Sequence, residues 1–197
     1  AGSEHAYRAA FKQSGIIQAE SMQALFGYAM AFASQPLPEG PGLAIITNSG
    51  GPGILAADAC DRSSLHLIPT RKETADRLRE FLPPTASLYN PIDIIGDASD
   101  ERYEKTLEVI LKDKLIHAVL ILLTPTAAVD SEAVARGIVR LARDAEKPIM
   151  TAFMGEKRVR GARKILQEHA IPAYDYPEDA VAAIDAMLSY RRWLEER

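Results

Sequence analysis

The chain has 197 residues, which at about 100 to 200 residues per domain predicts one large domain, or one domain with an extension. Acidic residues outnumber basic ones by 27 to 23, and the net charge of −4 argues against a nucleic-acid partner. The single cysteine, Cys60, excludes an internal disulfide and a thiolate cluster. No apolar stretch approaches the roughly 20 residues that cross a bilayer. We therefore expect a globular cytoplasmic domain that contacts neither nucleic acid nor membrane.

Two amphipathic segments open the chain, at 4–13 and 21–34, with apolar residues at helical spacing. Three prolines in the connector 35–42 exclude helix and central strand there. We therefore predict a helical extension and linker over 1–40 and a separate α/β domain over 41–197. Ala1, Gly2 and Ser3 are either native or a cloning remnant.

The apolar faces of these two segments would form a sticky patch if they were left exposed. We therefore expect the extension to dock on the following domain, the alternative being an arm swapped onto a neighbour. The residues predicted to make this contact are Phe11, Leu25, Phe26 and Phe32.

From Gly42 onward, short β-branched runs alternate with helical stretches, which predicts a parallel sheet with helices on both faces. The third run lacks alternation, as expected of a central strand buried on both sides. The five predicted strands are Leu43–Asn48, Leu65–Ile68, His117–Leu123, Pro148–Met154 and Ile171–Asp175.

Helix starts are readable between these strands. Thr70 followed by Glu73 predicts a capping box, and the helix it opens should end before Pro83. Asp130 places an acceptor and a negative charge at the start of another helix. Pro177 predicts the first residue of the last one.

In an open α/β sheet, ligands bind at the carboxyl ends of the strands where the strand order reverses, which for the order 2-1-3-4-5 lies between strands one and three. A glycine-rich stretch, 48–53, follows strand one and runs into a helix over Ile54–Cys60. A second stretch, 124–128, follows strand three and supplies two hydroxyls before the Asp130 helix. Two helix starts facing one crevice predict an anion site. The predicted phosphate-binding residues are Asn48, Ser49, Gly50, Gly51, Gly53, Thr124, Thr126, Ala127 and Ala128.

A glycine-rich turn is also common in this fold class purely for tight turning, so the motif alone is weak. It lacks the lysine of a P-loop and the spacing of a dinucleotide-binding turn. In a third loop, 89–97, Asn90 and Asp93 are turn formers or brace the site loops.

Other residue types offer no chemistry. No pair of the four histidines has metal-ligand spacing, and we predict no metal site. Cys60 is expected to be a buried small residue rather than a nucleophile. The basic residues of two runs read as solvated helix faces, namely Arg71, Lys72, Arg77 and Arg79, and Lys157, Arg158 and Arg160.

Four stretches closely resemble the NDP-forming acyl-CoA synthetases, relatives of succinyl-CoA synthetase: YRAAFKQSG from Tyr7, ITNSGGPGILAADAC from Ile46, FLPP from Phe81 and NPID from Asn90. The resemblance runs nearly end to end. It implies a flavodoxin-like ligase domain, an α/β fold with three layers and a doubly wound, parallel, five-stranded sheet of order 2-1-3-4-5.

The family makes acyl-CoA from acid, CoA and ATP through an acyl phosphate and a phosphohistidine. The resemblance implies that the phosphohistidine lies between two helix starts, one of them over 124–129 here, with Asn48 at the phosphate site. The family has a glycine pair where this chain has Thr126-Ala127. Its phosphohistidine motif matches a position upstream of Ala1, and His5 does not align with it, so we expect no catalytic residue in this chain.

The resemblance therefore implies one domain of a larger ADP-forming acid–CoA ligase, inactive when isolated. The domain itself would bind no cofactor, whereas the complete enzyme would use ATP or ADP, CoA and Mg. Expected partners are the CoA-binding and ATP-grasp domains or subunits, with homo-oligomerisation possible. The alternative is a regulatory, synthetase-like module of a protein acetyltransferase.

Overall fold

The structure is a computed structural model that describes residues 3–197. Of the residues that are either native or a cloning remnant, Ala1 and Gly2 lie outside the described range. Eight helices and six strands are present over these residues. The strands are β1 Gly42–Thr47, β2 His66–Leu67, β3 Ile92–Asp93, β4 Ala118–Leu123, β5 Ile149–Phe153 and β6 Ala173–Tyr174. The helices are α1 Glu4–Ser14, α2 Met22–Ser34, α3 Gly50–Asp61, α4 Lys72–Arg79, α5 Asp100–Leu111, α6 Ser131–Ala142, α7 Arg160–Glu168 and α8 Pro177–Glu195.

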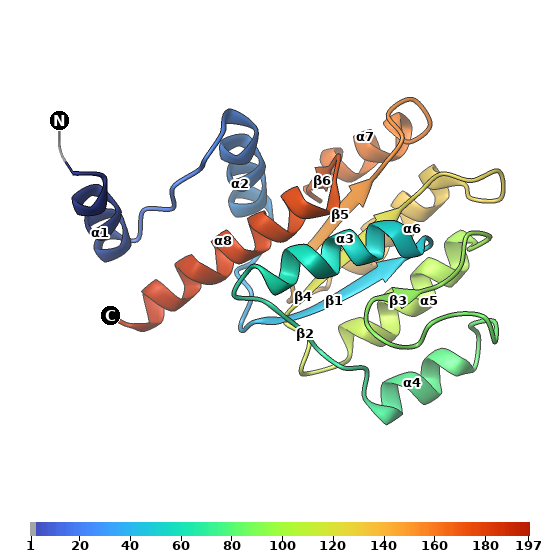
Figure 1. Cartoon of the computed structure of the whole chain (residues 1–197). Coiled ribbons are helices and arrows are strands. Elements are labelled where there is room, and N and C mark those ends of the chain that lie inside the picture. The colour runs from blue at the N-terminus through green and yellow to red at the C-terminus, as the bar shows by residue number, and fades with distance from the viewer. Residues whose placement is uncertain (1–2) are drawn as a thin grey trace.

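All strand pairs in the sheet are parallel, and the main path runs β2-β1-β4-β5-β6 (Figure 1). This confirms the five predicted strands and their order, and with them the α/β fold class. Every residue of β1 and β4 is buried, as the unbroken apolar run of β4 predicted.

A sixth strand, β3, lies in the stretch that was predicted as a loop, so the expectation of five strands was wrong. It pairs with the end of β1, at Ile46 and Thr47, whereas β2 pairs with its start, at Gly42 and Leu43. Two short strands thus share one edge of β1. A strand of two residues is too short for alternation or an apolar run to reveal it.

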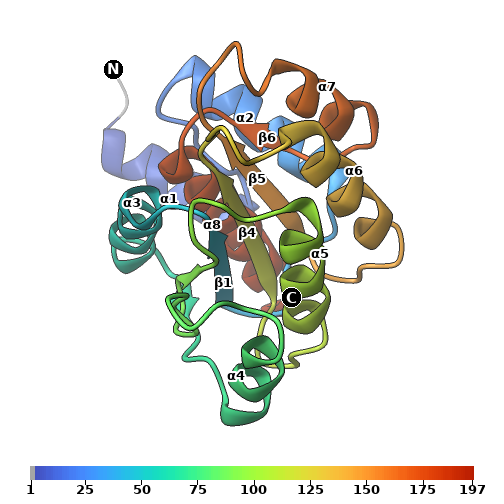
Figure 2. The same ribbon diagram turned by 90° about the vertical axis from the view of Figure 1, so that its right-hand side faces the viewer.

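Helices cover the sheet in two layers (Figure 2). On one face, α4, α5, α6 and α7 bury residues such as Leu78, Leu107, Ile138 and Leu166. On the other, α3 and α8 bury Ala56 and Ile184, with α2 lying on α8. Helix α3 follows β1 on one face of the sheet, and α6 follows β4 on the other. The strand order therefore reverses between β1 and β4, and the topology places the predicted site at their carboxyl ends.

The helix caps partly follow the sequence signals. Asp130 caps α6, its carboxylate accepting hydrogen bonds from two backbone amides, and Pro177 opens α8. The capping box at Thr70 was wrong: the residue before α4 is Arg71, and its side chain makes no cap hydrogen bond. Glu73 therefore lies one position too early for the reciprocal bond that defines a capping box.

The predicted extension is helical, and α1 ends at Gly15, whose φ of 70° suits glycine. Gly15 lies against the ring of Trp193, where a Cβ would come within 2.5 Å, and the Trp193 Nε1–H donates to the carbonyl of Gln13. Phe32 packs edge-on against Tyr190 of α8. The extension therefore docks on the domain mainly through α8.

Two of the four predicted docking residues do not dock. Leu25 is 48% exposed and Phe26 67% exposed, because the inward face of α2 carries smaller residues, with Ala31 fully buried. Phe11 is half-buried. None of the helices within 3–197 combines the length and apolarity needed to cross a membrane.

Candidate anion-binding crevice

The glycine-rich stretch after β1 is the first turn of α3 rather than a loop before it, so the predicted start of this helix at Ile54 was wrong. The Gly53 N–H already bonds to the Ser49 carbonyl, and Pro52 has no N–H. Within the described chain, no hydrogen bond engages the N–H of Gly50 or Gly51. Space around the Gly51 Cα is open, with nothing within 4 Å of where a Cβ would stand. The start of α3 thus presents two free donors to solvent.

Asn48 joins the two central strands just beyond their ends. Its Nδ2 donates to the Thr124 carbonyl and its Oδ1 accepts from the Thr124 N–H, both at 2.8 Å. The residue is 3% exposed. Its amide therefore holds the two site loops in register, and a direct contact between this side chain and a ligand has only a limited surface available.

The hydroxyl of Thr126 fixes the conformation of the β4–α6 loop. Thr126 Oγ1 donates to the Gly96 carbonyl at 2.8 Å and accepts from the Ala128 N–H. Thr124 Oγ1 is buried with no hydrogen-bond partner. Ala127 and Ala128 are exposed. The loop thus presents the exposed residues Ala127 and Ala128, whereas its unpaired Thr124 hydroxyl is buried away from solvent.

The two helix starts differ in a way that the sequence did not reveal. The Asp130 carboxylate accepts from the N–H groups of Glu132 and Ala133, each at 3.0 Å. The first turn of α6 already has its negative charge, whereas that of α3 has none. The start of α3, rather than that of α6, is therefore the candidate for anion binding.

The third loop also reaches the crevice. Asp93 Oδ1 accepts from the Ile95 N–H, and a Cβ at Gly50 would lie 3.6 Å from the other carboxylate oxygen. Arg102, which sequence reasoning missed, donates to the Ile94 carbonyl and to Asp97, holding the pKa of Asp97 below its usual range. No pattern marks Arg102, because its role depends on the irregular β3 loop.

Asn90 braces the sheet beside this site. Its Oδ1 accepts from the Ile45 N–H, and its Nδ2 donates to the carbonyls of Leu43 and Ile68. The side chain thereby fills the gap between β2 and β3 along the edge of β1, where backbone pairing is interrupted.

The remaining candidate residues have structural contacts and do not line this site. Cys60 is buried, and burial raises the pKa of its thiol to about 11. His117 Nδ1 accepts from the Gly42 N–H at the opposite end of β1. Arg71 is not a simply solvated cation as predicted, because it pairs with the buried Asp113 at 2.8 Å.

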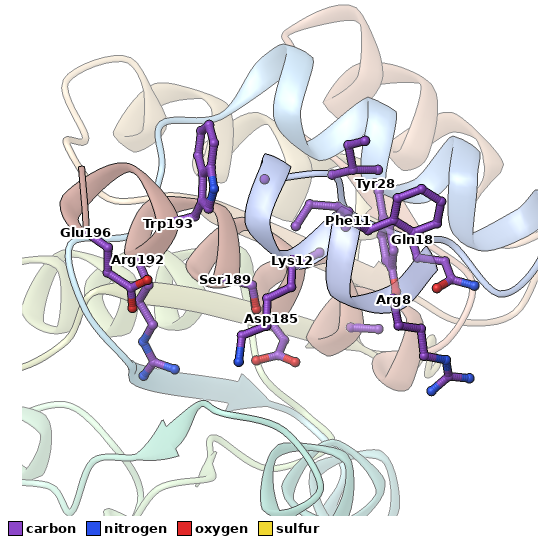
Figure 3. Close-up of a pocket in the computed structure, with 15 residues that line it drawn as sticks. Arg8, Phe11, Lys12, Gln18, Tyr28, Asp185, Ser189, Arg192, Trp193 and Glu196 are labelled. Atoms are coloured by element: carbon purple, nitrogen blue, oxygen red, sulfur yellow. The ribbon is translucent and has the colours of Figure 1, made fainter. Parts of the chain in front are cut away.

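A cavity of about 620 Å³ lies elsewhere, between α1 and α8 (Figure 3). It stands near the carboxyl end of α8, at the other end of the molecule from the start of α3 (Figure 1). Its main aromatic ring, Trp193, already contacts Tyr190, Gly15 and the Arg197 guanidinium. The crevice between β1 and β4, rather than this cavity, is the candidate site.

In a comparison with known families, residues 43–195 match the Ligase-CoA domain. The chain belongs to this family. Its relatives include the acetate–CoA ligase [ADP-forming] I of Archaeoglobus fulgidus, 42% identical over 98% of this chain and 27% of the relative. The subunit alpha of acetate–CoA ligase [ADP-forming] II of Pyrococcus furiosus is 39% identical over 95% of this chain and 42% of the relative.

Among solved structures, the Ligase-CoA domain described here resembles the dinucleotide forming acetyl-coenzyme A synthetase 1 of Ca. Korarchaeum cryptofilum, with a TM-score of 0.93 and 35% identity. The match covers 99% of this chain and 43% of that one. A second structure of that protein, in complex with phosphate and ADP, matches equally well. The chain thus spans less than half the length of these relatives.

Proposed function

We propose that this Ligase-CoA domain is part of a larger ADP-forming acid–CoA ligase and contributes the start of α3 to its phosphotransfer site. The single observation that carries the proposal is the pair of unengaged amides at Gly50 and Gly51, placed where α/β sheets bind ligands. The Ligase-CoA relatives are ADP-forming ligases, and a related structure holds phosphate and ADP.

The crevice offers an acceptor as well as donors. Phosphoryl oxygens would accept from the Gly50 and Gly51 amides, next to the positive end of the α3 dipole. The neighbouring Asp93 carboxylate would repel a bare anion, but it would accept from a ligand that carries its own N–H. A phosphorylated imidazole carries both groups when its second ring nitrogen is protonated, which fits the phosphohistidine chemistry implied by the sequence resemblance.

The partners and cofactors follow from the same proposal. The phosphohistidine, the CoA site and the ATP-grasp site, with ATP or ADP and Mg, would come from other domains or subunits. The proposed role of this domain is to bind and orient the phosphoryl group while it is transferred. Residues Ser49, Gly53, Thr126, Ala127 and Ala128 would shape the crevice around it.

A direct test uses the 197-residue chain alone. Incubation with radiolabelled ATP should leave no acid-labile label on the protein, because the proposal places the phosphorylated histidine outside this chain. Label on His5 or any other histidine here would show that the chain carries out the chemistry itself and would contradict the assigned role.

The second test uses the proposed larger enzyme, assayed for ATP formation from ADP, phosphate and acyl-CoA. Gly51→Asp places a carboxylate at the phosphoryl position and should lower kcat by about 100-fold or more. The matched control is Gln167→Asp, which adds the same charge at an exposed site on α7 and should leave kcat unchanged. Equal activity of the Gly51→Asp and control variants would refute the proposed site.

A further inference from the structure

One β-branched residue beside the candidate site has a left-handed backbone. Ile95, in the stretch between β3 and α5, has a φ of 70°. A branched Cβ fits this region poorly, so a positive φ at isoleucine costs free energy in the folded state. The next residue, Gly96, would adopt the same conformation without that cost, but its φ is not positive. The chain thus reverses at the isoleucine although a glycine is adjacent.

Contacts on both sides hold Ile95 in this conformation. Its own carbonyl accepts from the Ala98 N–H at 3.0 Å, and the Gly96 carbonyl accepts from Thr126 Oγ1 at 2.8 Å. On the other side, the preceding residue Ile94 is fully buried. Strained residues persist where the surrounding structure over-determines the backbone, and they cluster at functional sites.

The peptide group between Ile94 and Ile95 links two charged side chains. Its carbonyl accepts from Arg102 Nη1, and its N–H donates to Asp93 Oδ1, both at 2.9 Å. A donor at the carbonyl polarises the peptide group and strengthens the hydrogen bond that its N–H makes. Because the peptide group is planar and rigid, Arg102 also fixes the orientation of the N–H that holds Asp93.

Asp93 is left with one oxygen to offer. Within residues 3–197, no hydrogen bond engages its Oδ2, and a Cβ at Gly50 would lie 3.6 Å from that oxygen. Turning the carboxylate away from the start of α3 would break the bond to the Ile95 N–H. The free oxygen is therefore held beside the unengaged Gly50 amide.

We propose that Arg102 is a positioning residue, which acts through the Ile94–Ile95 peptide group to hold Asp93 Oδ2 at the start of α3. The inference rests on the proposed function, in which Asp93 accepts from the N–H of the phosphoryl-bearing ligand. The left-handed backbone at Ile95 lets one peptide group meet both charged side chains while the following carbonyls turn toward Ala98 and Thr126.

A direct contact of Arg102 with phosphate is the competing role for an arginine near this site. The two roles differ in what they require of Asp93. A positioning residue loses its effect once the Asp93 carboxylate is removed, whereas an arginine that binds phosphate keeps its effect. Two substitutions made singly and together therefore distinguish them.

The experiment is a double-mutant cycle in the proposed larger enzyme, assayed for ATP formation from ADP, phosphate and acyl-CoA. Arg102→Ala should lower kcat about tenfold and leave KM for phosphate nearly unchanged. In the Asp93→Asn enzyme, the same substitution should lower kcat less than about twofold. A tenfold loss in both backgrounds, or a raised KM for phosphate, would overturn the positioning role.

Two further arginine variants complete the cycle. Arg136→Ala is the matched control, because it removes an exposed arginine of α6 that is also ion-paired, and it should leave kcat unchanged. Arg102→Lys keeps a cationic donor within reach of the Ile94 carbonyl and should restore part of the lost kcat. A lysine variant as impaired as Arg102→Ala would contradict the assigned contact.

Gly51→Asp, measured in the same assay, separates this proposal from the proposed function. An inactive Gly51→Asp enzyme together with independent effects of Arg102→Ala and Asp93→Asn would overturn the positioning role alone. A fully active Gly51→Asp enzyme would overturn the proposed site itself.

A folding defect must not be mistaken for lost positioning, so the geometry is also tested in the 197-residue chain. Arg102→Ala should speed amide exchange at Ile95 about tenfold or more in the folded protein, because the peptide group loses its anchor. Unchanged exchange at Ile95 would contradict the link between Arg102 and Asp93.

The left-handed backbone is tested by two variants that remove the same branched side chain. Ile95→Gly should melt about 2 °C or more above Ile95→Ala, because only glycine adopts a positive φ freely. At an ordinary φ the order is reversed, since glycine gains more freedom in the unfolded chain. A higher melting temperature for Ile95→Ala would overturn the strained geometry on which the proposal depends.

Discussion

Two polar clusters stand at opposite ends of the central strands, and they differ in what remains unpaired. Beyond the amino end of β4, the buried Asp113 accepts from Arg71, Thr74 and the Leu115 N–H. Lys147 donates to the carbonyls of Leu111 and Asp113. Every charge in this cluster has a partner within the domain.

At the carboxyl end, the groups that have no partner are neutral donors, although the Asp93 carboxylate lies beside them. The amides of Gly50 and Gly51 and the hydroxyl of Thr124 are unengaged, while Asn48 holds the loops that carry them. The contrast indicates that the charged cluster stabilises the fold, whereas the exposed amides of Gly50 and Gly51 are open to a ligand. Charge alone would have pointed to the end of the molecule opposite the proposed site.

The largest expected effect on stability comes from removing Asp113. Asp113→Ala leaves the buried Thr74 hydroxyl and the Leu115 amide without their acceptor and removes the partner of Arg71, whose side chain is 43% exposed. We expect a loss of about 3 kcal/mol in the free energy of unfolding, measured by urea denaturation. A loss below about 0.5 kcal/mol would mean that this cluster does not stabilise the fold.

The stabilisation by Asp113 should also depend on pH. Burial alone would raise the pKa of Asp113, but hydrogen bonds from Thr74, Leu115 and Arg71 outweigh it and lower the pKa. The stabilisation is therefore complete above the unfolded pKa, about 3.9, and is lost as the pH falls through that value toward the folded pKa. The difference in stability between wild type and Asp113→Asn should shrink below about pH 4, and a difference that grows in acid would contradict the assignment.

Asn48→Ala should cost less, about 2 kcal/mol, because it leaves one N–H and one carbonyl of Thr124 unpaired. The same variant frees the β4–α6 loop, so amide exchange at Thr124 and Thr126 should become faster. Unchanged exchange together with unchanged stability would show that Asn48 does not hold the two loops together.

The sequence predicts the long elements well, because periodicity and caps are local signals. The order of the main strands, the α6 cap at Asp130 and the α8 start at Pro177 are confirmed. It fails where a contact between distant segments decides the outcome. Examples are β3, which pairs with β1, and Phe26, whose predicted contact depended on how α2 turns over α8.

The candidate site shows the same division. The position of the glycine turn follows from the strand order, so its residues were predictable. The pairing of Asn48 with Thr124 joins residues 76 apart in the chain, and the closeness of Asp93 to Gly50 depends on the unpredicted β3. A single sequence contains no local signal for either.

The smallest expected effect on stability is that of Gly51→Asp. Space around Gly51 is open, and an acidic side chain in the first turn of a helix is favourable, so the free energy of unfolding should change by no more than about 0.5 kcal/mol. A large loss would show that Gly51 is needed for folding rather than for binding.

The most direct test of the difference between the two clusters is a phosphate titration of the 197-residue chain, followed by amide chemical shifts. Binding should be weak, on the order of millimolar, with shifts centred on Gly50, Gly51 and the loop from Thr124. Gly51→Asp should abolish these shifts, and Gln167→Asp should leave them intact. Shifts centred on the amino-end cluster around Arg71 and Asp113, or site shifts that survive Gly51→Asp, would contradict the account.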